Sequence, residues 1–214
     1  MKILKMPQGT EEWLDARRPY FTASALGVWV ATDPKKWTAK QKEARETAIL
    51  KKVKSRLALE PEEEHYKNAV MQRGNDLEPE AKIAFMRKYM VSVEEVGFCI
   101  SDDGIFGCSP DGFIGETTDH MLEIKCPTFE KYYRISHGDK LYQKYVDSYK
   151  VQLHMQMAVT GAKSVHFWQY YPGLRPLELV IQRDETTELV LSNLKALSYD
   201  TLEIESEIKN ELSQ

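Results

Sequence analysis

The sequence predicts a layered α/β or α+β fold, in which helices pack against a central sheet. Helical hydrophobic patterning fills most of the first 89 residues, strand-like patterning with tight turns follows over residues 91–126, and helical patterning returns after residue 144. The chain has 214 residues, 42% hydrophobic and 29% charged, which is enough to bury a sizeable core. Because no internal repeat or Gly/Ser linker interrupts it, we expect a single domain over residues 1–214.

Helix-start signals recur in the first half of the chain. Thr10 precedes two glutamates, which favour the positive first turn of a short helix. Thr22 is placed to cap a second helix that reaches Ala31, and Thr38-x-x-Gln41 is a capping box for a basic helix. The basic helix is expected to end near residue 57, and a further helical pattern covers residues 63–89 with a glycine and a proline inside it.

The pattern then changes from a helical to a strand period. The segments that read as strands are residues 91–100, 104–108, 113–114 and 120–126. A Tyr-rich stretch leads to a helix over residues 144–159 that ends at Gly161. Residues 164–171 and 177–182 read as a closing hairpin, and Asp184 starts a final acidic helix that reaches about residue 211.

The formal net charge of −4 hides an uneven distribution. Residues 35–56 carry nine Lys/Arg against two Glu, whereas residues 184–214 carry eight Asp/Glu against two Lys. Residues 125–150 hold five tyrosines and six Lys/Arg, a composition that suits contact with a nucleic-acid backbone. The basic segments therefore keep a nucleic-acid partner open, and they are expected to face it while the acidic tail faces outward. A solvated amphipathic helix is the alternative for residues 38–57.

Cysteine usage and hydropathy exclude several classes of protein. Cys99, Cys108 and Cys126 have no CxxC spacing, so a disulfide framework and a Cys-rich metal site are not expected. No apolar run approaches the ~18 residues of a membrane span, and the first residues lack a signal-peptide pattern. We therefore expect a cytoplasmic protein with no membrane partner.

One Glu-x-Lys sequence stands out from the other two copies in the chain. Glu123 and Lys125 lie in a strand-like run, where residues two apart project from the same face. Two charges on one face of an apolar strand, with Ile124 buried behind them, need a partner or a metal ion.

The segment Ser109-Pro110-Asp111-Gly112 fits a type I turn that leads toward the same strand. Asp111 and Glu123 are thus expected to converge, and two carboxylates with a carbonyl and water suit Mg²⁺ or Mn²⁺. The alternative is an Asp that only forms the turn and a Glu–Lys pair at a sheet edge.

Motifs in a characteristic order add to this interpretation. They are Gln8-Gly9-Thr10-Glu11-Glu12-Trp13, Arg17, Thr22-Ala23-Ser24, Arg73-Gly74 with Leu77-Glu78-Pro79, Cys108 to Gly112, Leu122 to Pro127, and Tyr149-x-x-Gln152. Pro110-Asp111 with Glu123-Ile124-Lys125 resembles the PD-(D/E)xK nuclease motif. The whole series, from residue 8 to about 182, resembles the phage lambda exonuclease (YqaJ-like viral recombinase) family.

The resemblance implies a restriction-endonuclease-like three-layer fold, with a central mixed sheet flanked by helices. It implies Mg²⁺-dependent 5′→3′ digestion of one strand of linear double-stranded DNA from an end, with two metal ions that Mn²⁺ would replace. It also implies a ring-shaped homotrimer, a single-strand-annealing recombinase as partner, and a phage or prophage origin in a bacterial host.

The resemblance also assigns roles within the site. Asp111 would be shared by two metal ions, Glu123 and the Ile124 carbonyl would bind the first, and Glu78 would complete the acidic site. Lys125 would position or deprotonate the attacking water, and Gln152 would orient Lys125 or that water. The residues that match the family's 5′-phosphate pocket are Arg17, Ser24 and Ser109.

Two other functions remain open at this point. One is an endonuclease of the same fold, for restriction or repair, and the other is a catalytically silent DNA-binding scaffold for recombination. Intact Asp111, Glu123 and Lys125 count against the silent scaffold. A phosphate pocket favours the exonuclease, because an internal cut offers no terminal phosphate.

Overall fold

The computed structural model describes residues 1–23, 26–59 and 69–213. Its strands form two mixed sheets, which confirms the predicted α/β class but divides the expected single sheet in two. The first sheet has the order β1 (Lys2–Leu4), β4 (Phe98–Ile100), β5 (Phe106–Cys108), β2 (Phe21–Thr22). The second sheet has the order β3 (Val93–Glu94), β6 (Gly112–Ile114), β7 (His120–Lys125), β8 (Ser164–Gln169), β9 (Leu177–Gln182).

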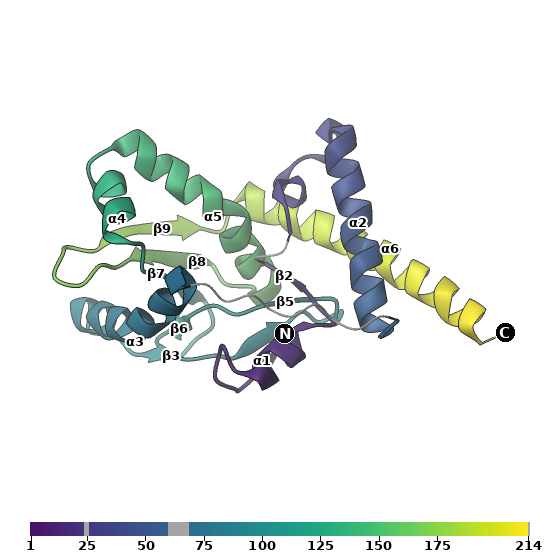
Figure 1. Ribbon diagram of the computed structural model, residues 1–214, viewed down its shortest axis with the longest axis horizontal. Coiled ribbons are helices and arrows are strands. Elements are labelled where there is room, and N and C mark those ends of the chain that lie inside the picture. The colour runs from purple at the N-terminus through teal and green to yellow at the C-terminus, as the bar shows by residue number, and fades with distance from the viewer. Residues whose placement is uncertain (24–25, 60–68, 214) are drawn as a thin grey trace.

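Helices cover these sheets (Figure 1). They are α1 (Glu11–Arg17), α2 (Ala39–Arg56), α3 (Ala69–Tyr89), α4 (Phe129–Ser136), α5 (Asp139–Thr160) and α6 (Glu185–Leu212), with short 3₁₀ segments η1 (Val28–Ala31) and η2 (Pro34–Lys36). The parallel pair β7–β8 lies inside the second sheet, with α3 against β7 and α5 against β8. This is the helix–sheet–helix layering that the sequence predicts.

Several predicted helix ends are confirmed by their caps. Thr10 accepts a hydrogen bond from the Trp13 N–H, and Thr38 forms the expected capping box with Gln41. Asp184 caps α6 in the same way through its carboxylate. Gly161 ends α5 with a φ of +78°, a left-handed conformation that favours glycine.

The helix predicted over residues 22–31 is wrong. Phe21 and Thr22 instead pair with β5 as the parallel strand β2. Among the described residues of this range, which exclude 24 and 25, only 28–31 are helical, as a single 3₁₀ segment. The β-branched Val28 and Val30 weaken helix formation here, and pairing with a strand that is distant in the sequence prevails. The Tyr-rich stretch forms the helix α4, and Pro79 lies within the uninterrupted helix α3.

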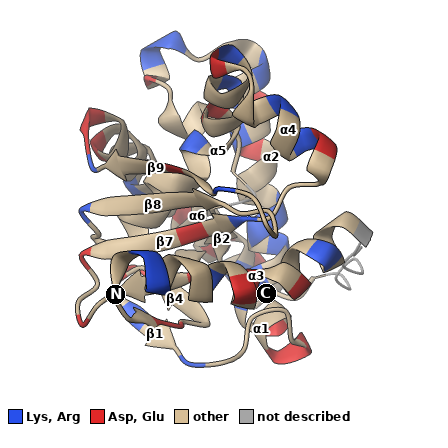
Figure 2. Cartoon of the chain, turned by 90° about the vertical axis from the view of Figure 1, so that its left-hand side faces the viewer, with Lys and Arg blue, Asp and Glu red and all other residues tan. Residues whose placement is uncertain are grey.

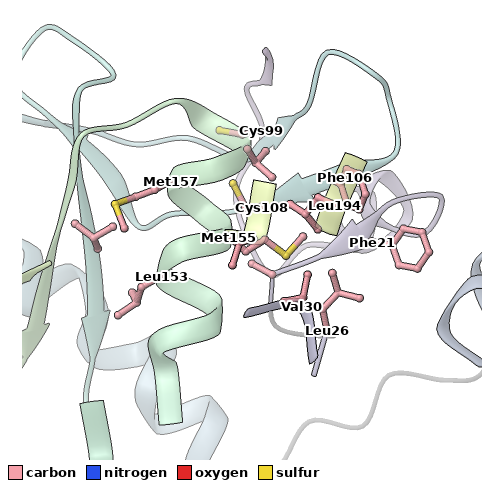
Figure 3. Packing of buried hydrophobic residues seen from close by; sticks show 14 of the residues in the cluster. Phe21, Leu26, Val30, Cys99, Phe106, Cys108, Leu153, Met155, Met157 and Leu194 are labelled. Carbon is pink, nitrogen blue, oxygen red and sulfur yellow. The ribbon is translucent and has the colours of Figure 1, made fainter. Parts of the chain in front are cut away.

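The main hydrophobic cluster lies between the first sheet, α5 and α6. Figure 3 shows Leu153, Met155 and Met157 of α5 among side chains of the neighbouring elements. A second cluster joins Phe85 of α3 to Trp168 of β8. Strand β7 separates the two, since Met121 belongs to the first cluster and Leu122 to the second.

The acidic helix α6 packs against the basic helix α2. Arg45 Nη2 lies 2.5 Å from Asp200 Oδ2, and Arg56 Nε lies 2.6 Å from Glu205 Oε2. Two carboxylates of the acidic tail thus neutralise two arginines of α2. Which face of the protein meets a nucleic acid stays a prediction. Within the described residues, no helix is both long and apolar enough to cross a membrane.

A buried histidine gives the fold a pH dependence. His154 is 1% exposed, with its Nδ1 2.8 Å from Thr187 Oγ1 and 3.6 Å from Asp184 Oδ1. Burial lowers the pKa of His154, although Asp184 opposes this shift. His154 therefore binds a proton more readily in the unfolded chain than in the folded protein. As the pH falls below about 6.5, this difference lowers the free energy of unfolding.

We predict that His154→Gln flattens the fall of the melting temperature between about pH 7 and pH 5.5, since glutamine carries no titrating group. Thermal denaturation across this range measures the effect. The exposed His120 provides the matched control, His120→Gln, which should follow the unsubstituted protein. Equal slopes for His154→Gln and the unsubstituted protein would contradict the assignment.

Candidate active site

The alternation of β7 brings its two charged residues into one cleft. Ile124 is 5% exposed and packs toward α3, whereas Glu123 and Lys125 project from the opposite face toward α5. The Lys125 Nζ lies 2.6 Å from Glu123 Oε1 and 5.2 Å from the centre of the Tyr149 ring. The predicted same-face placement of Glu123 and Lys125 is therefore confirmed.

Two glutamines of α5 hold the Glu123 carboxylate. Gln152 donates to Glu123 Oε1 at 2.7 Å, and Gln156 donates to Glu123 Oε2 at 2.8 Å. The two glutamines are four residues apart and so lie on one helix face. Since Glu123 is only 2% exposed, these bonds and Lys125 replace the solvation it loses on burial.

Asp111 joins the site from the connection between β5 and β6. Its N–H donates to the Leu122 carbonyl at 3.1 Å, and its Oδ2 accepts from the Ile124 N–H at 2.5 Å. The chain bends at Asp111 without a turn hydrogen bond. As expected, Asp111 and Glu123 converge on one cleft. A Cβ at Gly112 would lie 2.3 Å from Val93 Cγ1, so the residue after Asp111 must be this small.

Glu78 reaches the same cleft from α3. Burial raises the pKa of Glu78, Lys82 lowers it, and the negative charge of Glu123 raises it further. Burial, followed by repulsion from Glu123 and Glu78, holds the pKa of Asp111 well above its usual range. The cleft thus concentrates negative charge.

Lys125 responds to this field in the opposite direction. Burial alone would lower the pKa of Lys125, but the charges of Glu123 and Asp111 outweigh it and raise that pKa. Its ammonium group therefore stays protonated across the neutral range, where it offers N–H donors to a water or a phosphate oxygen.

The donor chemistry of the cleft fits a hard divalent cation. The cleft has a volume of about 410 Å³, and Glu78, Asp111 and Glu123 all line it. Carboxylate oxygens are the ligands of Mg²⁺ and Mn²⁺, and a cation would relieve the repulsion that raises the pKa values of Asp111 and Glu78. Across the part of the chain that the structure describes, no three His, Cys, Asp or Glu side chains already form a metal cage.

Two of the three predicted phosphate-binding residues lie in the described part of the chain. Arg17 and Ser109 line the same cleft as the carboxylates. The Arg17 guanidinium lies 3.9 Å from the centre of the Trp13 ring, and its buried Nε has no hydrogen-bond partner among the described residues. Burial lowers the pKa of Arg17, which remains a cation. Ser24 lies outside the described residues, so its predicted role stays a prediction.

The sequence analysis missed Gln156, and it quoted Trp13 in a motif without a role in the site. Gln156 contacts Glu123, and the only sequence signal was its spacing of four residues after Gln152. Trp13 donates through Nε1 to the Gly97 carbonyl at 2.9 Å and to Ser109 Oγ at 3.1 Å. Trp13 thus contacts both Ser109 and Arg17, which lie in segments far apart in the sequence.

The mixed sheets, their flanking helices and the cleft residues Asp111, Glu123 and Lys125 define a protein of the PD-(D/E)xK nuclease fold. The model of the YqaJ-like viral recombinase domain matches residues 12–163. The chain therefore belongs to the YqaJ-like viral recombinase family.

Solved structures agree with this assignment. The alkaline exonuclease LHK-Exo from Laribacter hongkongensis is 28% identical with a TM-score of 0.61, and the match covers 94% of this chain and 99% of that one. LHK-Exo in complex with dAMP is 27% identical with a TM-score of 0.60. A phage-related exonuclease from Haemophilus somnus 129PT is 15% identical with a TM-score of 0.62 over 88% of this chain and 96% of that one, a likeness of fold alone.

The search of curated proteins gave no match. The family and the LHK-Exo structures support a phage-type nuclease.

The crowding of carboxylates gives a prediction for Asp111. Asp111→Asn keeps an oxygen that accepts from the Ile124 N–H and removes one negative charge next to Glu123 and Glu78. We expect the melting temperature in metal-free buffer near pH 8 to rise, by about 2–4 °C for each 1 kcal/mol of relieved repulsion. Differential scanning calorimetry measures it.

The control is Asp119→Asn, which changes an exposed carboxylate that pairs with Lys163 at the surface. This variant should leave the melting temperature nearly unchanged. An unchanged or lower melting temperature for Asp111→Asn would show that the three carboxylates do not repel one another in the folded protein.

Proposed function

We propose that this protein is a Mg²⁺-dependent 5′→3′ exonuclease, which digests one strand of linear double-stranded DNA from a 5′-phosphorylated end. The proposed setting is phage-type recombination by single-strand annealing, with an annealing recombinase as partner. The observation that carries the proposal is that one cleft is lined both by Asp111, Glu123 and Lys125 and by Arg17 and Ser109. A cleavage site and an anion site thus share one cavity.

The residues that would hold Mg²⁺ are Asp111, Glu123, Glu78 and the Ile124 carbonyl. Two bound ions would neutralise the charge that develops on the phosphoryl oxygens and would make a water molecule more acidic. Gln152 and Gln156 keep the Glu123 carboxylate in one orientation, so its position does not change as charge enters the cleft. The Lys125 ammonium orients the attacking water by donating to its oxygen.

The end of the DNA strand is bound by other residues. Arg17 presents a planar guanidinium that donates two parallel hydrogen bonds to a phosphate, and its stacking on Trp13 limits its motion. The Ser109 hydroxyl adds a neutral donor. A pocket for a terminal phosphate favours digestion from an end over internal cleavage.

The relatives add independent support. LHK-Exo is named an alkaline exonuclease, and one of its structures contains dAMP, a mononucleotide of the kind that stepwise digestion releases. The identity of 28% over 94% of this chain makes the same reaction the natural assignment for the cleft.

Digestion of three DNA substrates tests the proposal. A linear duplex with a 5′-phosphate should be degraded with Mg²⁺ and not with EDTA, whereas a covalently closed circle should stay intact. Asp111→Asn should bind the duplex and leave it uncut, since it lacks a metal ligand. Cleavage of the closed circle would favour the endonuclease, and absence of any cleavage would favour the silent scaffold.

Arg17→Ala tests the phosphate pocket. Loss of a charged hydrogen bond worth ~1.5–3 kcal/mol should slow digestion of the 5′-phosphorylated duplex by roughly 10- to 150-fold. The 5′-hydroxyl duplex should be affected far less, so the two rates should approach each other. The neighbouring Arg18 pairs with Asp15 at the surface, and Arg18→Ala is the matched control. Equal slowing of both substrates by Arg17→Ala would refute the role in phosphate binding.

The proposed assembly is a homotrimeric ring around the DNA. A chain of net charge −4 must gather its cations on one side to bind DNA. The exposed cations of α2 and the segment before it are Lys35, Lys36, Lys40, Lys42 and Lys51. Figure 2 shows further Lys and Arg positions on α4 and α5. Repeated around a ring, such faces would surround DNA with positive charge.

Light scattering tests the ring. We expect a particle of about three times the chain mass of 24.8 kDa, with long DNA digested processively. A monomer at working concentration that releases the DNA after each cut would contradict the ring and leave the cleavage chemistry in place.

A further inference from the structure

We propose that the exposed face of α4 is a stacking platform for unpaired DNA nucleotides beside the active-site cleft. This inference rests on the proposed nuclease function, because it assigns a second contact surface to the same substrate.

The platform is a row of rings. Phe129, Tyr133 and His137 follow one another at intervals of four residues, so they project from one side of α4. The ring centroids of Phe129 and Tyr133 are 6.2 Å apart, and those of Tyr133 and His137 are 4.2 Å apart and stacked. Tyr171, in the connection from β8 to β9, extends the row, with its ring 5.6 Å from that of Phe129.

These rings are not needed to attach the helix to the body. The buried side chains of α4 are Tyr132 and Ile135, and these dock the helix. Phe129 and Tyr133 remain 49% and 53% exposed. A row of exposed aromatic rings is an unfavourable surface in water, and it indicates a ligand with flat apolar faces.

The charges around the rings are those that a nucleic acid requires. Lys131 and Arg134 are exposed on α4, where Glu130 is the single acid, and Arg175 is exposed beyond Tyr171. The Arg73 guanidinium lies 5.3 Å from the centre of the Tyr171 ring. Aromatic rings interspersed with cations bind single-stranded nucleic acid through base stacking and phosphate pairing.

The platform continues directly from the active site. Thr128, which precedes α4, and Lys131 both line the cleft that holds the carboxylates. Figure 1 shows α4 at the same end of the molecule as α3 and the connection between β8 and β9. The successive ring spacings of 6.2 and 4.2 Å give a row about as long as three stacked bases at about 3.4 Å each.

A second copy of this chain is the competing occupant of the surface. The cations around the rings disfavour a two-fold contact between identical platforms, since like charges would face each other. In a ring the platform would meet a different face of the next copy, and the particle mass of the double variant tests that contact. A polyanion with stackable bases satisfies both the charge and the rings. DNA is therefore the occupant that the surface fits.

The test uses a fluorescein-labelled 20-nucleotide oligothymidine with EDTA present, so that binding is measured without cleavage. Fluorescence anisotropy should show that Phe129→Ala with Tyr133→Ala raises the Kd by about 5- to 150-fold for each lost stacked base. Tyr133→Trp should keep the affinity. The matched control is Tyr199→Ala with Leu202→Ala, which removes exposed apolar groups from α6 and should change nothing.

Duplexes with a 5′ or a 3′ overhang show which strand occupies the platform. The double variant should bind more weakly only to the duplex whose overhang reaches the platform. Unchanged oligothymidine binding by a folded double variant would overturn the proposal. A fall in particle mass, with unchanged binding, would assign the surface to a contact between copies. The unsubstituted protein could cut no DNA while the double variant still shows reduced affinity for oligothymidine. That result would refute the proposed function and support the platform.

Discussion

Glu123 places a carboxylate between β7 and α5, where it accepts hydrogen bonds from Lys125, Gln152 and Gln156. A charge in this position needs every one of its partners, since removal of one partner of a buried ion pair costs about 3–5 kcal/mol. The bonds therefore determine how α5 lies on the sheet. A shift of α5 by one residue would turn both glutamines away from Glu123.

The same strand determines the position of the opposite helix. The side chains of Leu122 and Ile124 pack with Phe85 of α3, the helix from which Glu78 lines the cleft. Asp111 is tied to β7 by its own backbone and by the Ile124 N–H. All three carboxylates are thus positioned by one strand of six residues, although they come from three distant segments. The packing behind the three carboxylates keeps them close together despite their mutual repulsion.

The sequence predicted the structure correctly where the signal is local. Strand alternation placed Glu123 and Lys125 on one face, and capping residues such as Thr38 marked helix starts correctly. It was insufficient where a contact is long-range. The residues of β2 carry a helix-start signal, but pairing with β5 decides their conformation. Gln156 could not be recognised as a partner of Glu123, because that depends on how α5 lies on the sheet. The order of motifs indicated Glu78, which local pattern alone does not.

The charges of the chain are easier to understand as local pairs than as a sum. Asp200 and Glu205 of α6 are held by arginines of α2, so these carboxylates do not project their charge toward a ligand on the other side of α2. Val190, Leu194 and Leu197 anchor α6 in the main cluster and keep its acids in that position. The cleft carboxylates Glu78, Asp111 and Glu123 differ from these, because they repel one another although Lys82 and Lys125 lie beside two of them. Net charge alone is therefore a poor guide to how this acidic chain would meet a polyanion, since the effect of each carboxylate depends on its local partner.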